Sequence, residues 1–176
     1  MSQTPSILNV GCGQVRIPGA IGIDFDPQSC ADVIHDLDRY PWPFEDRSFD
    51  RILCSHVLEH LRDPRRAMQE IQRIVRPNGT VEIATPHYSS PESWGDLTHY
   101  MHFSLKSFEP FYQRGNRQEA FDLVSCRLGF GKGIPSLLGR LLAAALGLSF
   151  YEKYCCFLFP GRNMEFLLRR KPDAPR

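Results

Sequence analysis

Short apolar runs recur through the first half of the chain, separated by a helical pattern or by longer connections. They cover residues 7–10, 20–24, 32–35, 50–54 and 80–84. Runs of this length with nearly continuous apolar character are typical of buried parallel strands rather than of strands with one solvated face. We therefore expect a parallel sheet covered on both faces, as in doubly wound α/β folds.

One helix is indicated between the fourth and fifth runs. Apolar residues recur there at helical spacing, namely at Ala67, Met68, Ile71, Ile74 and Val75. Asp63 is suited to cap the helix N-terminus and Pro64 to occupy the first helical position. Gly79 lies just past the end of the pattern. These signals predict a helix between Asp63 and Arg76.

Residues 134–159 form the most apolar segment of the second half. The leucines at helical spacing are Leu137, Leu138, Leu141, Leu142 and Leu146. Such a stripe needs burial, so the favoured interpretation is a core helix. The alternatives are a lid or wall for a lipid-like, quinone-like or aromatic acceptor, or contact with a membrane surface. Within this segment, residues 134–150 are the candidate for a membrane span, but Arg140 and several glycines interrupt them and they fall short of the roughly 20 apolar residues required. We therefore expect no transmembrane segment.

Chain length, net charge and cysteine content limit the classes of protein to which this chain can belong. The 176 residues suit a single domain. The 21 basic and 20 acidic residues create no large field that would attract nucleic acid. The six cysteines show no paired metal spacing, and we expect reduced thiols. The N-terminus does not resemble a secretory signal, and we expect a cytoplasmic protein.

A series of short motifs falls where the strand and helix pattern changes element. In chain order the motifs are Val10-Gly-Cys-Gly13, Ile23-Asp24, Asp36-Leu37, Pro43-Phe44, Ser48-Phe49-Asp50, His56-Val-Leu-Glu-His60 and Arg76-Pro-Asn-Gly79. In this order and spacing the chain resembles the class I S-adenosylmethionine-dependent methyltransferases, over about residues 6–86. The resemblance implies a Rossmann-like, doubly wound and mostly parallel sheet with an antiparallel closing strand. The strand-like runs at 121–128 and 164–170 would close that sheet.

The same resemblance implies the function and its division along the chain. Residues 1–176 would be one methyltransferase domain, with residues 6–86 as the cofactor-binding half and residues 87–170 as the acceptor-side half. S-adenosylmethionine would be the cofactor. The acceptor would be a small molecule or a glycan-type compound. A cofactor-binding subunit without catalysis of its own is the alternative.

The motif residues would form the cofactor site at the carboxyl ends of the strands, where open α/β sheets bind ligands. By resemblance, the loop of Gly11, Cys12 and Gly13 packs against the amino-acid part of the cofactor. Glycine lets the backbone turn sharply and approach a ligand without a Cβ in the way. Asp24 would accept both ribose hydroxyls, as a short carboxylate can.

The adenine and the methyl group would lie further along the same edge. By resemblance, the Asp36 carboxylate accepts from the exocyclic amine of adenine and a neighbouring backbone N–H meets a ring nitrogen, with Leu37 beside the ring. Ser55 and His56 follow the fourth run and would lie beside the methionine moiety and the methyl group.

The connection between the first two strands is unusually short. Ten residues lie between Gly13 and Asp24, which leaves room for a compact loop over residues 14–19 but not for the helix usual in the family. A trimmed group of bacterial relatives is similar in this respect. A pyrophosphate would need the N–H groups of a helix start directly after the glycine turn. The short loop therefore argues against a dinucleotide oxidoreductase.

Histidines mark the start of the acceptor-side half. His87 follows the fifth strand and is the predicted general base, since a histidine of near-neutral pKa suits an acceptor that must lose a proton. His99 and His102 follow, with Asp96 upstream. The favoured interpretation is that these side chains line a substrate pocket in which one histidine acts as base. A metal-dependent protein that uses His87, His99 and His102 is the less favoured alternative, and structural packing is the third interpretation. The leading prediction assigns no metal.

Overall fold

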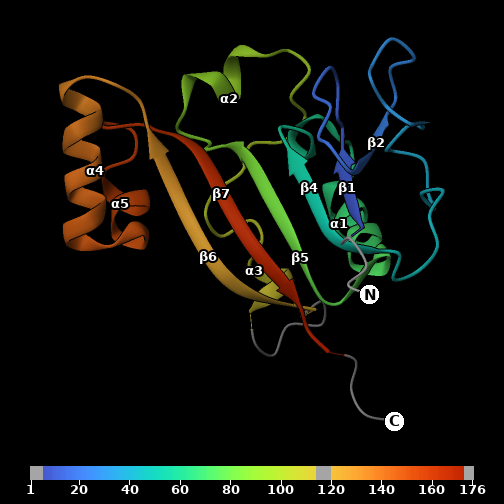
Figure 1. Cartoon of the computed structure of the whole chain (residues 1–176). Helices are drawn as coiled ribbons and strands as arrows, with labels where there is room; N and C mark the ends of the chain where they lie inside the picture. The colour runs from blue at the N-terminus through green and yellow to red at the C-terminus, as the bar shows by residue number, and fades with distance from the viewer. Residues whose placement is uncertain (1–5, 114–119, 173–176) are drawn as a thin grey trace.

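The computed structural model describes residues 6–113 and 120–172, which form one seven-stranded mixed sheet (Figure 1). The strand order is β3-β2-β1-β4-β5-β7-β6. The strands are β1 (Ile7–Val10), β2 (Ala20–Asp24), β3 (Val33–Ile34), β4 (Phe49–Ser55), β5 (Val75–Pro86), β6 (Phe121–Phe130) and β7 (Gly161–Arg170). The pairs among β1 to β5 are parallel, whereas β7 is antiparallel to both of its neighbours. The predicted α/β sheet with an antiparallel closing strand is confirmed.

The register of the parallel strands brings their carboxyl ends to one edge. Val10 at the end of β1 lies opposite Ile23 of β2 and Cys54 of β4. Asp24 lies opposite Ile34 at the end of β3. The residues that follow these strands therefore share the upper edge of the sheet in Figure 1.

Helix α1 (Pro64–Ile74) is the crossover between β4 and β5. The Asp63 carboxylate accepts from the Arg66 N–H at 2.9 Å, and proline occupies the start of the helix, as predicted. The helix ends at Ile74, and Val75 already begins β5. The predicted helix is thus confirmed, with its last two residues belonging to the strand.

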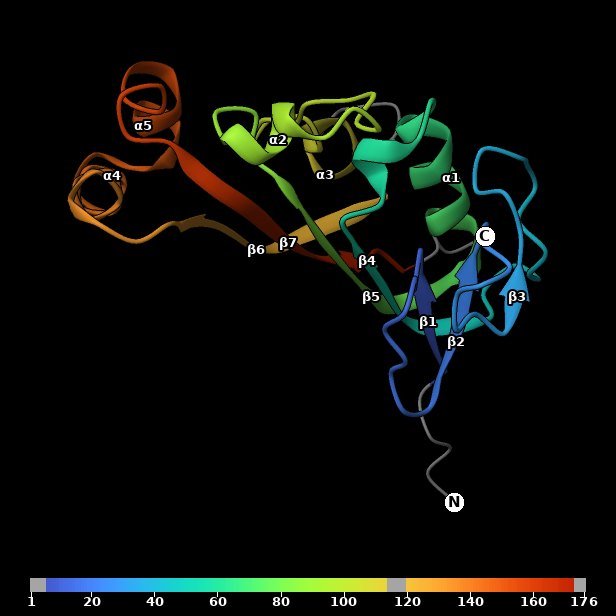
Figure 2. The ribbon, with the colours of Figure 1, turned by 90° about the horizontal axis from the view of Figure 1, so that it is seen from above.

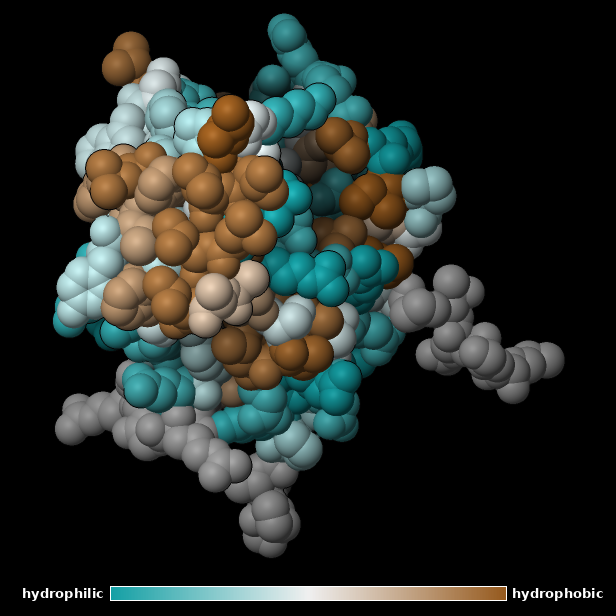
Figure 3. Space-filling model, turned by 90° about the vertical axis from the view of Figure 1, so that its left-hand side faces the viewer, coloured by the Kyte–Doolittle hydropathy of each residue, from teal (hydrophilic) through white to brown (hydrophobic). Residues whose placement is uncertain are grey.

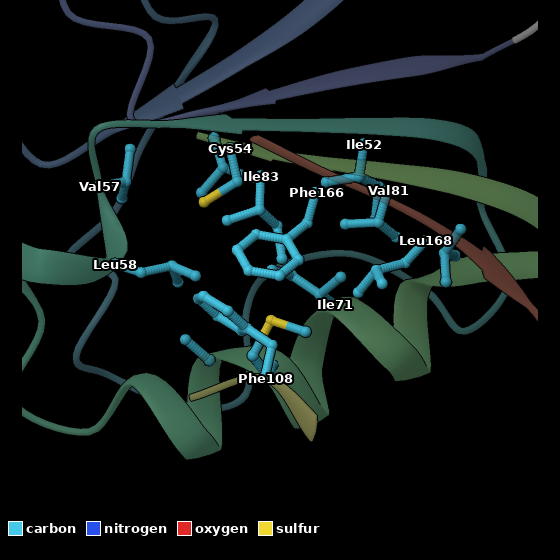
Figure 4. Close-up of a cluster of buried hydrophobic side chains, with 14 of the residues drawn as sticks. Ile52, Cys54, Val57, Leu58, Ile71, Val81, Ile83, Phe108, Phe166 and Leu168 are labelled. Carbon is cyan, nitrogen blue, oxygen red and sulfur yellow. The ribbon is translucent and has the colours of Figure 1, made fainter. Parts of the chain in front are cut away.

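The main core fills the space between α1 and the sheet, as Figure 4 shows. Ile52 of β4 and Val81 of β5 point toward Ile71 of α1, and all three side chains are fully buried. Phe166 and Phe108 extend this core toward β7, with their ring centroids 4.9 Å apart. The apolar periodicity of α1 and the apolar residues of the strands are therefore satisfied against one another.

The predicted cover on both faces of the sheet is wrong. Helices α1, α2 (Pro91–Gly95) and α3 (Glu109–Tyr112) lie on the same side of the sheet (Figure 2). Among the described residues, the connections from β1 to β2, from β2 to β3 and from β3 to β4 contain no helix that could cover the other side. That face is partly polar instead, with an ion pair between Arg51 and Glu82 at 2.7 Å. The short crossovers thus leave one face of a mainly parallel sheet uncovered.

Two helices, α4 (Ile134–Leu146) and α5 (Leu148–Tyr154), stand beyond the ends of β6 and β7 (Figure 1). The predicted helix is present, but its predicted burial is wrong: its most exposed leucines are Leu137, Leu138, Leu141 and Leu146, each at least 42% exposed. The buried side of the pair packs around Ala143 and Tyr151. The helices reach past the body of the sheet, so the main core cannot cover the leucines. Within the described part of the chain, no helix is long and apolar enough to cross a bilayer.

Candidate functional site

The loop after β1 is close-packed on one side and open on the other. Gly11 and Gly13 both have positive φ, +60° and +49°. A Cβ on Gly11 would lie 2.3 Å from Val57 Cγ2, whereas a Cβ on Gly13 would meet nothing within 4 Å. The Gly11 N–H donates to the Ile23 carbonyl at 2.8 Å, which ties the loop to β2. Gly13 thus borders open space in which a ligand can approach the backbone.

Asp24 connects the glycine loop to the loop after β2. Its side chain is nearly buried, and its Oδ2 accepts from the Gly13 N–H at 2.8 Å. Its Oδ1 accepts from the Asp26 N–H at 3.0 Å. Each carboxylate oxygen has a second acceptor site. Asp24 can therefore hold the loop and still accept two further hydrogen bonds.

Asp36 and Leu37 lie next along the edge, because the His35 N–H donates to the Asp24 carbonyl at 2.8 Å. The exposed Asp36 carboxylate accepts from the Asp38 N–H at 3.0 Å and so caps a turn. Leu37 is buried, and its carbonyl accepts from Trp42 Nε1 at 3.1 Å. Within the described residues no hydrogen bond uses the Leu37 N–H. The Asp36 carboxylate, a hydrogen-bond acceptor, and the Leu37 N–H, a free donor, therefore belong to adjacent residues.

A cavity of about 840 Å³ opens on the uncovered face and runs to this edge. Among its lining residues are Gly11, Cys12, Ser55 and His56. The other four predicted cofactor residues, Gly13, Asp24, Asp36 and Leu37, follow the neighbouring strand ends and are not among its lining residues. The structure thus brings all eight to one edge, and the cavity itself takes in half of them.

Cys12 is an inert member of this group. Its side chain is 4% exposed and packs over β2, where a Cβ on Gly22 would lie 2.9 Å from Cys12 Sγ. Burial raises the pKa of the Cys12 thiol to about 11. The thiol is therefore protonated at neutral pH and offers a small apolar wall rather than a nucleophile.

His56 begins the turn after β4 with a φ of +56°. Its N–H donates to the Ala84 carbonyl at 2.8 Å, which anchors the turn to β5. Its Nδ1 lies 3.2 Å from Glu59 Oε1, and this hydrogen bond raises the pKa of His56. The ring remains 45% exposed. His56 is thus an oriented imidazole that solvent or a ligand can reach.

Glu59 is a site residue that the sequence reasoning did not single out. Its side chain is 1% exposed. Its Oε2 accepts from Thr85 Oγ1 at 3.1 Å, and its Oε1 is the oxygen nearest His56. The signal that could have indicated Glu59 is an acidic residue within the His56–His60 motif, preceded by Leu58 and followed by a histidine. The pattern alone does not tell a buried acid from a solvated one.

His87 has no exposed surface. Its Nε2 lies 3.1 Å from Glu152 Oε1 of α5 and its Nδ1 lies 2.7 Å from Ser89 Oγ. Burial lowers the pKa of His87, against the opposing effect of the Glu152 carboxylate. Glu152 also accepts from the Leu105 N–H at 2.6 Å. Both ring nitrogens of the predicted base are thus engaged within the protein.

The three histidines weighed as metal ligands do not form a ligand group in the described part of the chain. His102 stacks on Trp94 with 3.6 Å between ring centroids, and its Nδ1 lies 2.9 Å from Ser93 Oγ. His87 is held by Glu152. His99 lies instead with Glu59 and His60, the one such group among the described residues.

Comparison with known proteins adds a family and a fold. A family model described as "Methyltransferase domain" matches residues 3–125. A demethylmenaquinone methyltransferase of Corynebacterium urealyticum is 31% identical over 81 residues, which is 46% of this chain and 32% of the relative. A demethylmenaquinone methyltransferase of Streptomyces griseus is 27% identical over 84 residues, 42% of this chain and 36% of the relative. The chain thus spans about a third of the length of these curated relatives.

Solved structures are similar over nearly the whole chain. A SAM-dependent methyltransferase from Archaeoglobus fulgidus matches with a TM-score of 0.62 and 18% identity, and the match covers 95% of this chain and 86% of that one. At this identity the likeness shows the fold alone.

Proposed function

From the premise that the chain belongs to the methyltransferase domain family, we propose that it transfers a methyl group from S-adenosylmethionine to an acceptor at the carboxyl edge of the sheet. The observation that carries the proposal is the convergence of Gly13, Asp24, Asp36 and His56 on that edge. A small-molecule or glycan-type acceptor stays a prediction.

The residues at this edge fit the cofactor by their shape and their donor set. The open space at Gly13 admits a ligand against the backbone, and Asp24 keeps one free acceptor site on each oxygen for the ribose hydroxyls. The exposed Asp36 carboxylate and the Leu37 N–H match the donor and acceptor on the adenine edge. The turn that follows Gly13 contains no helix start for a pyrophosphate. S-adenosylmethionine supplies a methyl group already activated on a sulfonium.

The chain's remaining contribution is to orient the acceptor. Orientation alone contributes roughly 7–11 kcal/mol to such reactions, and a general base adds about 10²–10⁴-fold where a proton must leave. His56 has exposed surface and an orienting carboxylate in Glu59. The predicted base His87 has no exposed surface in this structure. We therefore propose His56 as the base and His87 as a residue that positions the loop after β5.

Calorimetry with S-adenosylhomocysteine tests the cofactor site. The variant Asp24→Asn keeps the shape of the side chain but removes its charge, which should weaken binding roughly 10- to 150-fold if charged hydrogen bonds of about 1.5–3 kcal/mol are lost. Asp122→Asn is the matched control, because Asp122 is exposed on β6 and pairs with Lys171. Equal affinity in the two variants would remove Asp24 from the ribose site.

The alternative of a cofactor-binding subunit without catalysis of its own draws support from the uncovered face. A sheet face without helices is a surface that a partner protein can cover. Tight binding of S-adenosylhomocysteine, with methyl transfer only after addition of a partner, would favour this interpretation. Turnover by the isolated chain would exclude it.

We also propose that residues 134–159 contact an anionic membrane surface. Figure 3 shows apolar side chains gathered over α4 and α5. The most exposed apolar residues of this segment are Ile134 at the start of α4 and Phe157 and Leu158 in the turn after α5. Lys132, Arg140 and Lys153 are exposed around this surface, whereas Glu152, the acid of α5, is buried. Apolar area with a basic rim is the pattern that binds anionic headgroups.

Vesicle sedimentation tests this contact. We expect the chain to sediment with vesicles that contain phosphatidylserine and less with phosphatidylcholine alone. The double variant Phe157→Ser, Leu158→Ser should lose binding, whereas Leu97→Ser, at a fully exposed leucine of another loop, should retain it. Sedimentation that the double variant leaves unchanged would refute the assignment.

A further inference from the structure

We propose that Glu59, His60 and His99 form a binding site for a divalent first-row transition-metal ion. Glu59 and His60 belong to the 3-10 turn η1 (Leu58–His60) after β4, and His99 comes from the loop after α2. One ligand atom of each lies within 4.8 Å of the others. Small side-chain rotations can bring such a set to the distances of about 2.0–2.2 Å at which nitrogen and oxygen bind zinc.

The hydrogen bonds of His99 fix its tautomer. Its Nδ1 lies 2.9 Å from the Ser93 carbonyl oxygen. A carbonyl only accepts, so Nδ1 carries the proton and Nε2 of the neutral ring presents a lone pair. The Asp96 carboxylate is 3.8 Å from Nε2, beyond hydrogen-bond distance. The side chain is 7% exposed, so this lone pair is nearly shielded from water.

His60 has the same tautomer for a related reason. Its Nδ1 lies 2.9 Å from Thr98 Oγ1. The Thr98 hydroxyl donates its proton to Asp96 at 2.6 Å and therefore accepts from His60 Nδ1. In the neutral ring of His60, as in that of His99, Nε2 therefore carries the free lone pair. A chain from imidazole through a hydroxyl to a carboxylate is an arrangement that orients and strengthens a metal-binding histidine.

Glu59 supplies a buried negative charge at the same point. Its two oxygens take one hydrogen bond from Thr85 and one from His56, and each retains a second acceptor site. A buried carboxylate is costly unless a positive charge offsets it. A bound cation would do so whether or not His56 is protonated.

The set of donors indicates the class of metal and its role. Two imidazoles and one carboxylate suit zinc, iron or nickel better than magnesium or calcium. Three protein ligands leave a coordination position open, as in catalytic rather than structural sites. His56, beside Glu59, is also the residue we place at the methyl acceptor. We infer that the open position takes an oxygen of the acceptor, an extension that rests on the proposed function, whereas metal binding itself does not.

A competing explanation is plain packing of the two rings. The centroids of His60 and His99 lie 4.6 Å apart with an interplanar angle of 72°, an edge-to-face contact that requires no ion. In that case the two lone pairs would have no common function.

Cobalt titration of the chelator-treated chain decides between the two explanations. We expect one equivalent of Co²⁺ to bind, with visible absorption bands that an equimolar amount of Zn²⁺ abolishes. His60→Ala and His99→Ala should each weaken Co²⁺ binding at least tenfold, and His102→Ala, in the same loop, should not. Thr98→Val keeps all three ligands but removes the partner of His60, and should weaken binding about 10- to 100-fold.

Folding and cofactor binding are followed separately. Circular dichroism checks each variant, and calorimetry with S-adenosylhomocysteine should give the same affinity in His60→Ala and His99→Ala as in the unaltered chain. Absence of Co²⁺ binding to the unaltered chain would overturn the metal site, as would equal Co²⁺ affinity in folded His60→Ala and His99→Ala variants. Absence of S-adenosylhomocysteine binding with intact Co²⁺ binding would overturn the proposed function and leave the metal site standing.

Discussion

Alanine at Gly11 should destabilise the fold more than alanine at Gly13, whereas alanine at Gly13 should weaken cofactor binding. Both glycines have positive φ, which costs an L-residue about 1–2 kcal/mol. At Gly11 the new Cβ would also lie 2.3 Å from Val57 Cγ2 and 3.2 Å from Val57 Cβ. Rotation of the valine moves its methyl groups but not its Cβ, so the backbone must shift. Overpacking of this kind costs about 1–3 kcal/mol.

The expected loss of unfolding free energy is therefore about 2–5 kcal/mol for Gly11→Ala and about 1–2 kcal/mol for Gly13→Ala. Gly19→Ala is the control for the backbone cost, because Gly19 has a φ of +78° and open space around it. Equilibrium urea denaturation measures all three variants.

Cofactor binding should distinguish Gly13→Ala from Gly19→Ala, the two variants with open space around the new methyl group. A methyl group at Gly13 would occupy the space that we assign to S-adenosylhomocysteine, so calorimetry should show weaker binding in Gly13→Ala than in Gly19→Ala at similar stability. Equal losses of stability in Gly11→Ala and Gly13→Ala would refute the packing argument. Unchanged affinity in Gly13→Ala would refute the position of the cofactor.

Three further predictions concern buried and titrating groups. In the chelator-treated chain, the raised pKa of His56 stabilises the fold below the unfolded pKa of about 6.5, and this stability is lost as pH rises through the folded pKa. His56→Gln should therefore flatten the fall in the urea midpoint as pH rises above about 6.5. His87→Ala should lower the free energy of unfolding by about 1–3 kcal/mol in urea denaturation, because the buried Glu152 loses its hydrogen bond to the imidazole and keeps that from the Leu105 N–H. His87→Gln should recover part of the loss, and unaltered stability in both variants would show that the pair is not structural. Ile71→Ala, at a fully buried position of α1, should cost about 2–5 kcal/mol, and a loss below 1 kcal/mol would contradict the core described for α1.

Local signals in the sequence were sufficient to predict most of the strands and the helix within residues 6–86. A helix cap such as Asp63, a proline at the first helical turn and a glycine after a strand act over a few residues, so their meaning does not depend on distant parts of the chain. The resemblance of the motif series to the methyltransferase family, together with the rule that open α/β sheets bind ligands at the carboxyl ends of their strands, predicted that Asp24 and Asp36 lie at the same edge as the glycine loop. The missing helix after Gly13 was equally a matter of counting residues.

What the tertiary structure decided involves residues that are distant in the chain. His87 and Glu152 are 65 positions apart, and no spacing rule connects them. The grouping of Glu59 and His60 with His99 depends on how the loop after α2 folds back onto η1. The exposure of the leucines on α4 likewise follows from where the end of β6 projects that helix. An amphipathic pattern records that a face is apolar, because hydrophobicity is a local property, but which surface covers that face is set by the packing of the whole chain.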